Sequence, residues 1–123
     1  MKILIADDEE LVRSALEGIL KKGAGYETDF ALDGEEALKK MLANSYDGVL
    51  LDIEMPKLDG YTILKKVRLD KPDLPVIFVT GKGNAKKVAS SIDRDGLNAL
   101  IEKPFTPAEV LEVVFQAVRK KAD

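Results

Sequence analysis

The chain has 123 residues, enough for one compact domain, and carries a formal charge of −3 with both signs mixed along its length. It contains neither cysteine nor histidine, which excludes disulfide frameworks, thiolate nucleophiles and the usual zinc ligands. There is no basic stripe for nucleic acid, no apolar stretch near the about 20 residues of a membrane span, and no signal peptide in the start MKILIADDEE, so we expect a cytoplasmic protein.

Strand-like and helix-like patterns alternate along the whole chain. The first half predicts a buried strand at 2–6, an amphipathic helix at 9–22, an edge strand at 26–31, a helix at 34–44 and a buried strand at 49–51. The second half predicts a helix at 61–69, a strand at 75–79, a weak helix at 85–94, a strand at 99–101 and a helix from Pro107, capped by Thr106, to about Lys120. Five βα units predict a single α/β domain over 1–123, with a parallel sheet and helices on both faces.

Polar residues follow four of the predicted strands. Asp7 and Asp8 follow the first strand, Asp52 the third, Thr80 the fourth and Lys103 the fifth. Ligands of doubly wound sheets bind outside the carboxyl ends of the strands, because those ends meet at one edge. We therefore expect these five residues to lie close together.

The residue types at this edge indicate metal-dependent chemistry on a phosphate-like group. Crowded carboxylates raise one another's pKa, and a divalent cation offsets their repulsion. Oxygen ligands without histidine or cysteine favour Mg²⁺ or Mn²⁺. Asp52 at a strand tip is a nucleophile or a metal ligand, and Lys103 suits an anionic ligand. Glu9 and Glu10 are expected to do no more than favour the start of a helix.

These motifs resemble the receiver domain of response regulators in two-component signalling. The resemblance is carried by Asp7-Asp8, by Asp52 in LLDIEMPKLDG, by Thr80, and by Lys103-Pro104-Phe105, and it covers the whole chain. It implies a flavodoxin-like (βα)5 three-layer sandwich with a five-stranded parallel sheet in the order 2-1-3-4-5. The chain would then be a single receiver domain.

The resemblance also implies a role for each site residue. Asp52 would be the phosphoacceptor. Asp8, Asp52 and the backbone carbonyl of Glu54 would bind Mg²⁺, or alternatively Mn²⁺, and Asp7 would act through a water. Lys103 and Thr80 would contact the phosphoryl oxygens, Thr80 as the switch. The Lys103–Pro104 peptide could be cis, an isomer that sequence does not show.

Partners follow from the same resemblance. The phosphoryl donor would be a phosphohistidine on a histidine kinase or phosphotransfer protein, and phosphorylation would switch a protein-interaction surface toward a downstream protein. The chain would not be an enzyme beyond its own phosphorylation and slow autodephosphorylation. It would be a monomer or a weak phosphorylation-dependent dimer. The kinase would meet Arg13, Ser14, Glu17 and 105–107, with Phe105 either exposed or buried, and output would use the faces of 85–94 and 107–119.

Three residues depart from the family pattern or extend it. Leu100 stands where the family often has an aromatic residue that moves together with the switch hydroxyl. Either Leu100 fills the same pocket without moving as a gate, or the signal passes through the loop after Thr80 and the weak helix. Glu54 and Lys82 are hypothesised to pair across the mouth of the site and slow hydrolysis of the acyl phosphate. Unchanged phosphate lifetimes in Glu54→Ala and Lys82→Ala would contradict that pairing.

Three other classes of protein share part of this pattern. A hydrolase of the haloacid dehalogenase type also uses Asp, Thr, Lys and Mg²⁺, but it needs an acid matched here only by Glu54, and no cap domain fits this length. A flavodoxin-like binding module needs a phosphate-cradling loop after the first strand, where this chain has four acids. Intact Asp52 and Lys103 argue against a receiver-shaped adaptor that is never phosphorylated.

Overall fold

The computed structural model describes residues 1–81, 88 and 97–122. Its strands are β1 (Lys2–Ala6), β2 (Glu27–Ala31), β3 (Gly48–Asp52), β4 (Val76–Thr80) and β5 (Ala99–Glu102). Its helices within those residues are α1 (Glu10–Ala24), α2 (Gly34–Ala43), α3 (Gly60–Asp70) and α6 (Pro107–Ala122). These bounds agree with the predicted elements to within about two residues. The helix predicted at 85–94 lies outside the described residues, apart from Val88.

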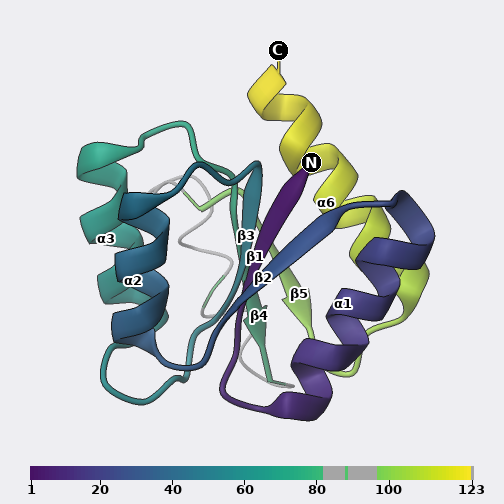
Figure 1. The fold of residues 1–123 in the computed structure, drawn as a ribbon, viewed down its shortest axis with the longest axis horizontal. Helices are drawn as coiled ribbons and strands as arrows, with labels where there is room; N and C mark the ends of the chain where they lie inside the picture. The colour runs from purple at the N-terminus through teal and green to yellow at the C-terminus, as the bar shows by residue number, and fades with distance from the viewer. Residues whose placement is uncertain (82–87, 89–96, 123) are drawn as a thin grey trace.

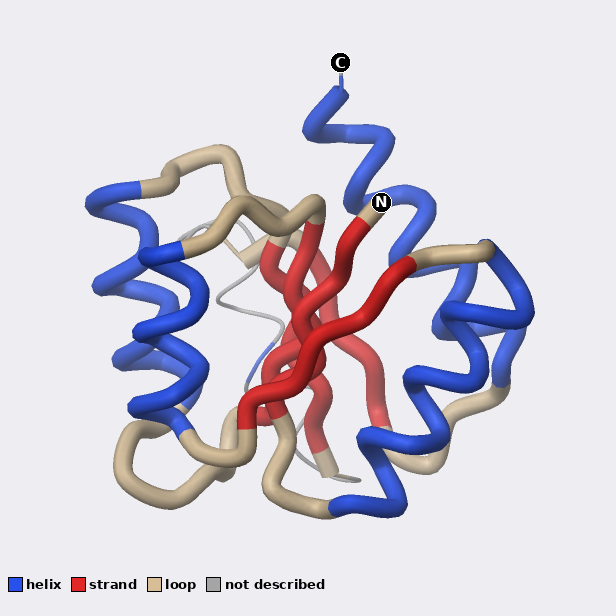
Figure 2. Tube along the Cα trace, viewed as in Figure 1, coloured by secondary structure: helices blue, strands red, loops and turns tan. Residues whose placement is uncertain are grey.

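The five strands form one parallel sheet in the order β2-β1-β3-β4-β5. Helices α1 and α6 cover one face of the sheet, and α2 and α3 cover the other (Figure 1). The three layers of the expected flavodoxin-like sandwich are therefore present, as the tube in Figure 2 shows. No helix in the described part of the chain combines the length and apolar character needed to span a bilayer.

The hydrophobic core lies in two layers, one on each face of the sheet. Successive strand residues point to opposite faces, so a strand buried on both sides supplies both layers. On the α1–α6 side the largest buried members are Ile3, Ile5, Leu16, Leu20, Leu50 and Ile77. On the α2–α3 side they are Leu4, Met41, Leu51, Ile63, Leu64 and Phe78. The central strands are thereby fixed on both faces, which makes their ends a rigid platform.

Side-chain caps begin three of the helices near the carboxyl ends of the strands. Asp33 accepts the N–H of Glu36 at 2.9 Å at the start of α2, and Asp59 accepts the N–H of Thr62 at 2.9 Å at the start of α3. Thr106 accepts the N–H of Glu109 at 3.2 Å, which confirms its predicted role as the cap of α6. The loops at this edge are thus held from the helix side as well as from the sheet.

The two ends of the described chain lie at the opposite, amino edge of the sheet. Strand β1 begins there, and α6 runs back past it to finish beyond that edge (Figure 1). The loops between strand ends and helix starts are therefore separated from both chain ends by the length of the sheet.

Candidate functional site

The carboxyl edge of the sheet gathers the polar residues that the strand ends predicted. Asp52 ends β3 and Thr80 ends β4, its neighbour, while Asp7 follows β1 directly. These three side chains are buried, with 6%, 3% and 1% of their residue surface exposed, and they are the buried polar residues of the described chain. Asp8 is exposed beside them. Groups that would ordinarily face water are thus held out of it at one edge.

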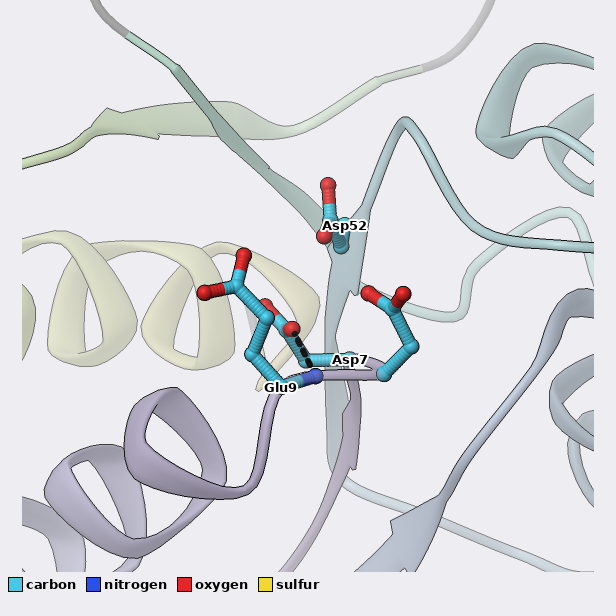
Figure 3. A group of neighbouring side chains, drawn as sticks. Asp7, Glu9 and Asp52 are labelled. Carbon is cyan, nitrogen blue, oxygen red and sulfur yellow. Dashed lines mark hydrogen bonds between the residues drawn. The ribbon is translucent and has the colours of Figure 1, made fainter.

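Four carboxylates form the centre of this edge. One oxygen from each of Asp7, Asp8, Glu9 and Asp52 lies within 4.8 Å of the others. Figure 3 shows Asp7 and Glu9, from the segment between β1 and α1, beside Asp52 at the end of β3. The donors are all oxygens, which suits Mg²⁺ or Mn²⁺ and not the nitrogen and sulfur preference of zinc. The residues therefore fit a hard divalent cation.

Lys103 supplies a positive charge to the same group. Its Nζ lies 3.4 Å from Asp7 Oδ2, 3.7 Å from Asp52 Oδ2 and 3.7 Å from Glu9 Oε1. The Lys103–Pro104 peptide is cis, and the Lys103 N–H donates to the carbonyl oxygen of Thr80 at 2.8 Å. The side chain of Lys103 thus reaches the ends of β1 and β3, while its backbone is hydrogen-bonded to the end of β4.

The electrostatics of the edge show in two pKa shifts. Burial raises the pKa of Asp52 to about 6, and the charges of Asp7 and Asp8 add to this, although the N–H of Glu54 and the ammonium of Lys103 oppose it. Burial alone would lower the pKa of Lys103, but the nearby charges of Asp52 and Asp7 outweigh burial and raise it. The site therefore has too little positive charge for its carboxylates, a deficit that a bound cation would correct.

The loop after β3 holds Asp52 in place. Its Oδ1 accepts the N–H of Glu54 at 3.0 Å, and the N–H of Gly60 closes the loop onto the carbonyl of Ile53 at 2.9 Å. A Cβ at Gly60 would lie 2.9 Å from the Cα of Ile53, so this close approach requires glycine. The start of α2 also touches the loop, where the N–H of Gly34 donates to the carbonyl of Pro56 at 3.1 Å.

The structure locates the other predicted residues less centrally. The Glu54 side chain is exposed, and its proposed partner Lys82 lies outside the described residues. Thr80 contacts the site through its backbone carbonyl; no hydrogen bond between described residues joins its hydroxyl to Asp52 or Lys103. Leu100 is half-buried against the α2–α3 core layer.

The expected kinase-facing residues are only partly free. Ser14 is exposed, but Arg13 donates to the backbone carbonyl of Asp7 at 2.8 Å, and Glu17 accepts the hydroxyl of Thr28 at 3.1 Å. Phe105 is half-buried against the α1–α6 core layer, between the exposed and buried alternatives.

Glu9 is the site residue that sequence reasoning missed. Expected only to favour the helix start, it does occupy the N-cap position of α1, but its side chain makes no capping hydrogen bond and reaches the acid group and Lys103 instead. A signal was present, because N-caps are usually Ser, Thr, Asp or Asn, and a glutamate there is unusual.

Comparisons with known proteins agree on one family. A family model described as response regulator receiver domain matches residues 3–115. The transcriptional regulatory protein DltR of Streptococcus agalactiae is 37% identical over 111 residues, which is 90% of this chain and 49% of that protein. The alkaline phosphatase synthesis transcriptional regulatory protein PhoP of Bacillus subtilis is 38% identical over 109 residues, covering 89% of this chain and 45% of PhoP. The chain thus spans about half the length of these curated relatives.

Solved structures show the same fold at similar length. A putative response regulator from Chloroflexus aurantiacus has a TM-score of 0.87 at 35% identity, covering 96% of this chain and 97% of the other. A CheY-like receiver domain protein from Methanospirillum hungatei has a TM-score of 0.88 at 29% identity, covering 98% and 95%. The fold of this chain is therefore shared with solved receiver domains of similar length.

Proposed function

This chain belongs to the receiver domains of response regulators, and on that premise we propose that Asp52 accepts a phosphoryl group from a phosphohistidine on a partner protein. The observation that carries the proposal is the setting of Asp52, a buried carboxylate among three other carboxylates and 3.7 Å from the ammonium of Lys103. A structural aspartate would gain nothing from such crowding, because each neighbouring carboxylate destabilises its charged form.

The metal proposed for this reaction is Mg²⁺, with Mn²⁺ as the alternative. Asp8 and Asp52 would hold it directly with the backbone carbonyl of Glu54, and Asp7 would act through a water. When bound, the ion would supply charge neutralisation between the carboxylates and the incoming phosphoryl oxygens. Binding it also favours the ionised form of Asp52, which is the form that can attack phosphorus.

The proposed chemical step is a phosphoryl transfer between two groups. An oxygen of the Asp52 carboxylate forms a bond to phosphorus, the P–N bond of the phosphohistidine breaks, and the imidazole leaves with the bonding electrons and takes a proton from water. Such transfers depend on positioning and on stabilising charge on the phosphoryl oxygens. Lys103 is proposed to contact one of those oxygens, and Thr80 at the end of β4 is proposed to contact another.

The consequence we propose is a change in a protein-interaction surface, not turnover of a substrate. New contacts of Thr80 and Lys103 with the phosphoryl group would shift the population of loop states at this edge. The partners would be a histidine kinase or phosphotransfer protein and a downstream protein, in the cytoplasm. The chain would act as a phosphoacceptor whose own catalysis is limited to its phosphorylation and slow dephosphorylation.

The test is treatment with acetyl phosphate and Mg²⁺, followed by intact mass measurement. Wild type should gain one phosphoryl group, while Asp52→Asn and Asp52→Ala should gain none, and EDTA should prevent the gain in wild type. Two variants are used so that poor folding of one does not decide the result. Wild type that gains no phosphoryl group would contradict the proposal. In a separate assay, repeated turnover of a generic phosphate ester would indicate a hydrolase instead.

A further inference from the structure

Glu9 stands at the N-cap of α1 without capping it. Its backbone is extended, as at other N-caps, yet its side chain accepts no hydrogen bond from the first turn of the helix. Its N–H donates instead to Asp7 Oδ1 at 2.9 Å, the bond drawn dashed in Figure 3. The backbone of Glu9 thus braces Asp7, and its side chain is left free for another contact.

That contact is with Lys103 and the acid group. Glu9 Oε1 lies 3.7 Å from Lys103 Nζ, a distance equal to that between Lys103 and Asp52. The Glu9 side chain is 64% exposed, whereas those of Asp7 and Asp52 are 2% and 9% exposed. Glu9 is therefore a carboxylate at the solvent-facing side of the site. It is paired with the Lys103 ammonium group, which an incoming phosphoryl group must reach.

The charge of Glu9 decides whether the Mg²⁺-bound site is negative or neutral. Four carboxylates and one ammonium leave the group at −3, and Mg²⁺ would leave it at −1. Without the charge of Glu9, the Mg²⁺-bound group would be neutral. A phosphodonor is itself an anion, so the last negative charge at the mouth repels it and also competes with it for Lys103.

We propose that Glu9 is a positioning residue that holds Lys103 until the phosphoryl group arrives and that slows reaction with anionic phosphodonors. This inference rests on the proposed phosphorylation of Asp52. Glu9 acts through Lys103 and through its own charge, and it forms no bond to phosphorus. In the step tested below, an Asp52 oxygen bonds to phosphorus, the P–O bond of acetyl phosphate breaks, and acetate leaves with the electron pair.

The same charge has opposite effects on the metal and on the phosphodonor. It attracts Mg²⁺, so Glu9→Gln should weaken Mg²⁺ binding, by about fivefold at low salt for charges about 6 Å apart at the solvent boundary. It repels acetyl phosphate, a dianion at neutral pH, so at saturating Mg²⁺ the same variant should be phosphorylated about fivefold faster. With phosphoramidate, a monoanion, the gain should be about twofold. Weaker metal binding together with faster phosphorylation is a pair of changes that general loss of structure does not produce.

The experiment compares Glu9→Gln with Glu10→Gln, its neighbour in the chain. Glu10 is exposed in the first turn of α1 and is not among the four clustered carboxylates, so it controls for loss of one charge near the helix start. Mg²⁺ affinity is measured by titration calorimetry, and phosphorylation by intact mass with both donors at saturating Mg²⁺ in low and high NaCl. Glu9→Asp keeps the charge and should retain the wild-type ratio between the two donors.

The expected result is the opposite pair of changes in Glu9→Gln alone, diminishing as NaCl screens the charges. If wild type is phosphorylated but Glu9→Gln and Glu10→Gln have the same phosphorylation rates and Mg²⁺ affinities, this inference is overturned and the proposed function stays intact. Slower phosphorylation of Glu9→Gln at saturating Mg²⁺ would also overturn it. Wild type that gains no phosphoryl group would overturn the proposed function, and this inference with it.

Discussion

Replacing Asp52 by asparagine removes the buried negative charge of the site while keeping the shape of the side chain. In EDTA, we expect Asp52→Asn to stabilise the protein at neutral pH. The rise in the Asp52 pKa from its ordinary 3.8 to about 6 corresponds to about 3 kcal/mol against the ionised form in the fold. For a domain of 123 residues this is a rise of about 10 °C in Tm.

The sign of the pH dependence follows from the direction of the shift. Because folding raises the pKa of Asp52, the folded state binds more protons than the unfolded state between about pH 4 and pH 6. Wild-type stability should therefore fall as pH rises through this window, by about 3 kcal/mol from this group. Asp52→Asn lacks the titration, so the gap between the variants should open from near zero at pH 4 to its full size at pH 7.

The assay is urea unfolding in EDTA, followed by circular dichroism at several pH values from 4 to 7.5. Asp70→Asn is the matched control, since it removes one exposed carboxylate at the end of α3, on another part of the surface. Adding Mg²⁺ should then stabilise wild type more than Asp52→Asn, because the proposed site binds the ion to the folded chain through that carboxylate. Parallel pH profiles for wild type and Asp52→Asn would refute the reasoning.

Two further predictions concern the scaffold. Gly34→Ala places a Cβ 1.9 Å from the carbonyl oxygen of Leu58, so it should lower the free energy of unfolding by about 2 kcal/mol or more. The control is Gly18→Ala in α1, where a Cβ would meet nothing within 4 Å; it should raise the free energy of unfolding by up to about 1 kcal/mol. Equal effects of the two variants in urea unfolding would contradict the clash. Tyr46→Phe removes the hydroxyl that donates to Asp29 Oδ2 at 2.7 Å and should lower the free energy of unfolding by about 1–2 kcal/mol. Burial acts to raise the pKa of Asp29, but hydrogen bonds from Tyr46, Phe30 and Lys40 outweigh it and keep this pKa low, so the Asp29 carboxyl should titrate at higher pH in Tyr46→Phe, as measured by NMR.

The sequence predicted the sheet and the centre of the site because both follow from strand ends. Buried apolar runs fix where parallel strands lie, and parallel strands bring Asp7, Asp52 and Lys103 to one edge whatever the details of the loops. No comparable rule locates Glu9. Whether its side chain caps the helix or turns to Lys103 depends on the backbone entering α1 and on the position of a lysine far along the chain.

Two other features of the structure could not be predicted from the sequence for similar reasons. The half-burial of Phe105 depends on how α6 docks against α1, and a sequence pattern offers the exposed and buried alternatives equally. The contact between the start of α2 and the loop after β3 joins Gly34 to Pro56, and the proximity of a helix start to a loop leaves no periodic signal in the sequence. Contacts of this kind require coordinates.

The separation of the chain ends from the carboxyl edge has a practical consequence for measurement. Strand β1 begins, and α6 finishes, on the side of the sheet away from Asp52 (Figure 1). A tether attached at either end would therefore hold the molecule on a sensor surface with its reactive face turned toward the solution. Binding of the proposed partners, a kinase domain, Mg²⁺ and a downstream protein, can then be followed on such a surface without the anchor blocking the approach.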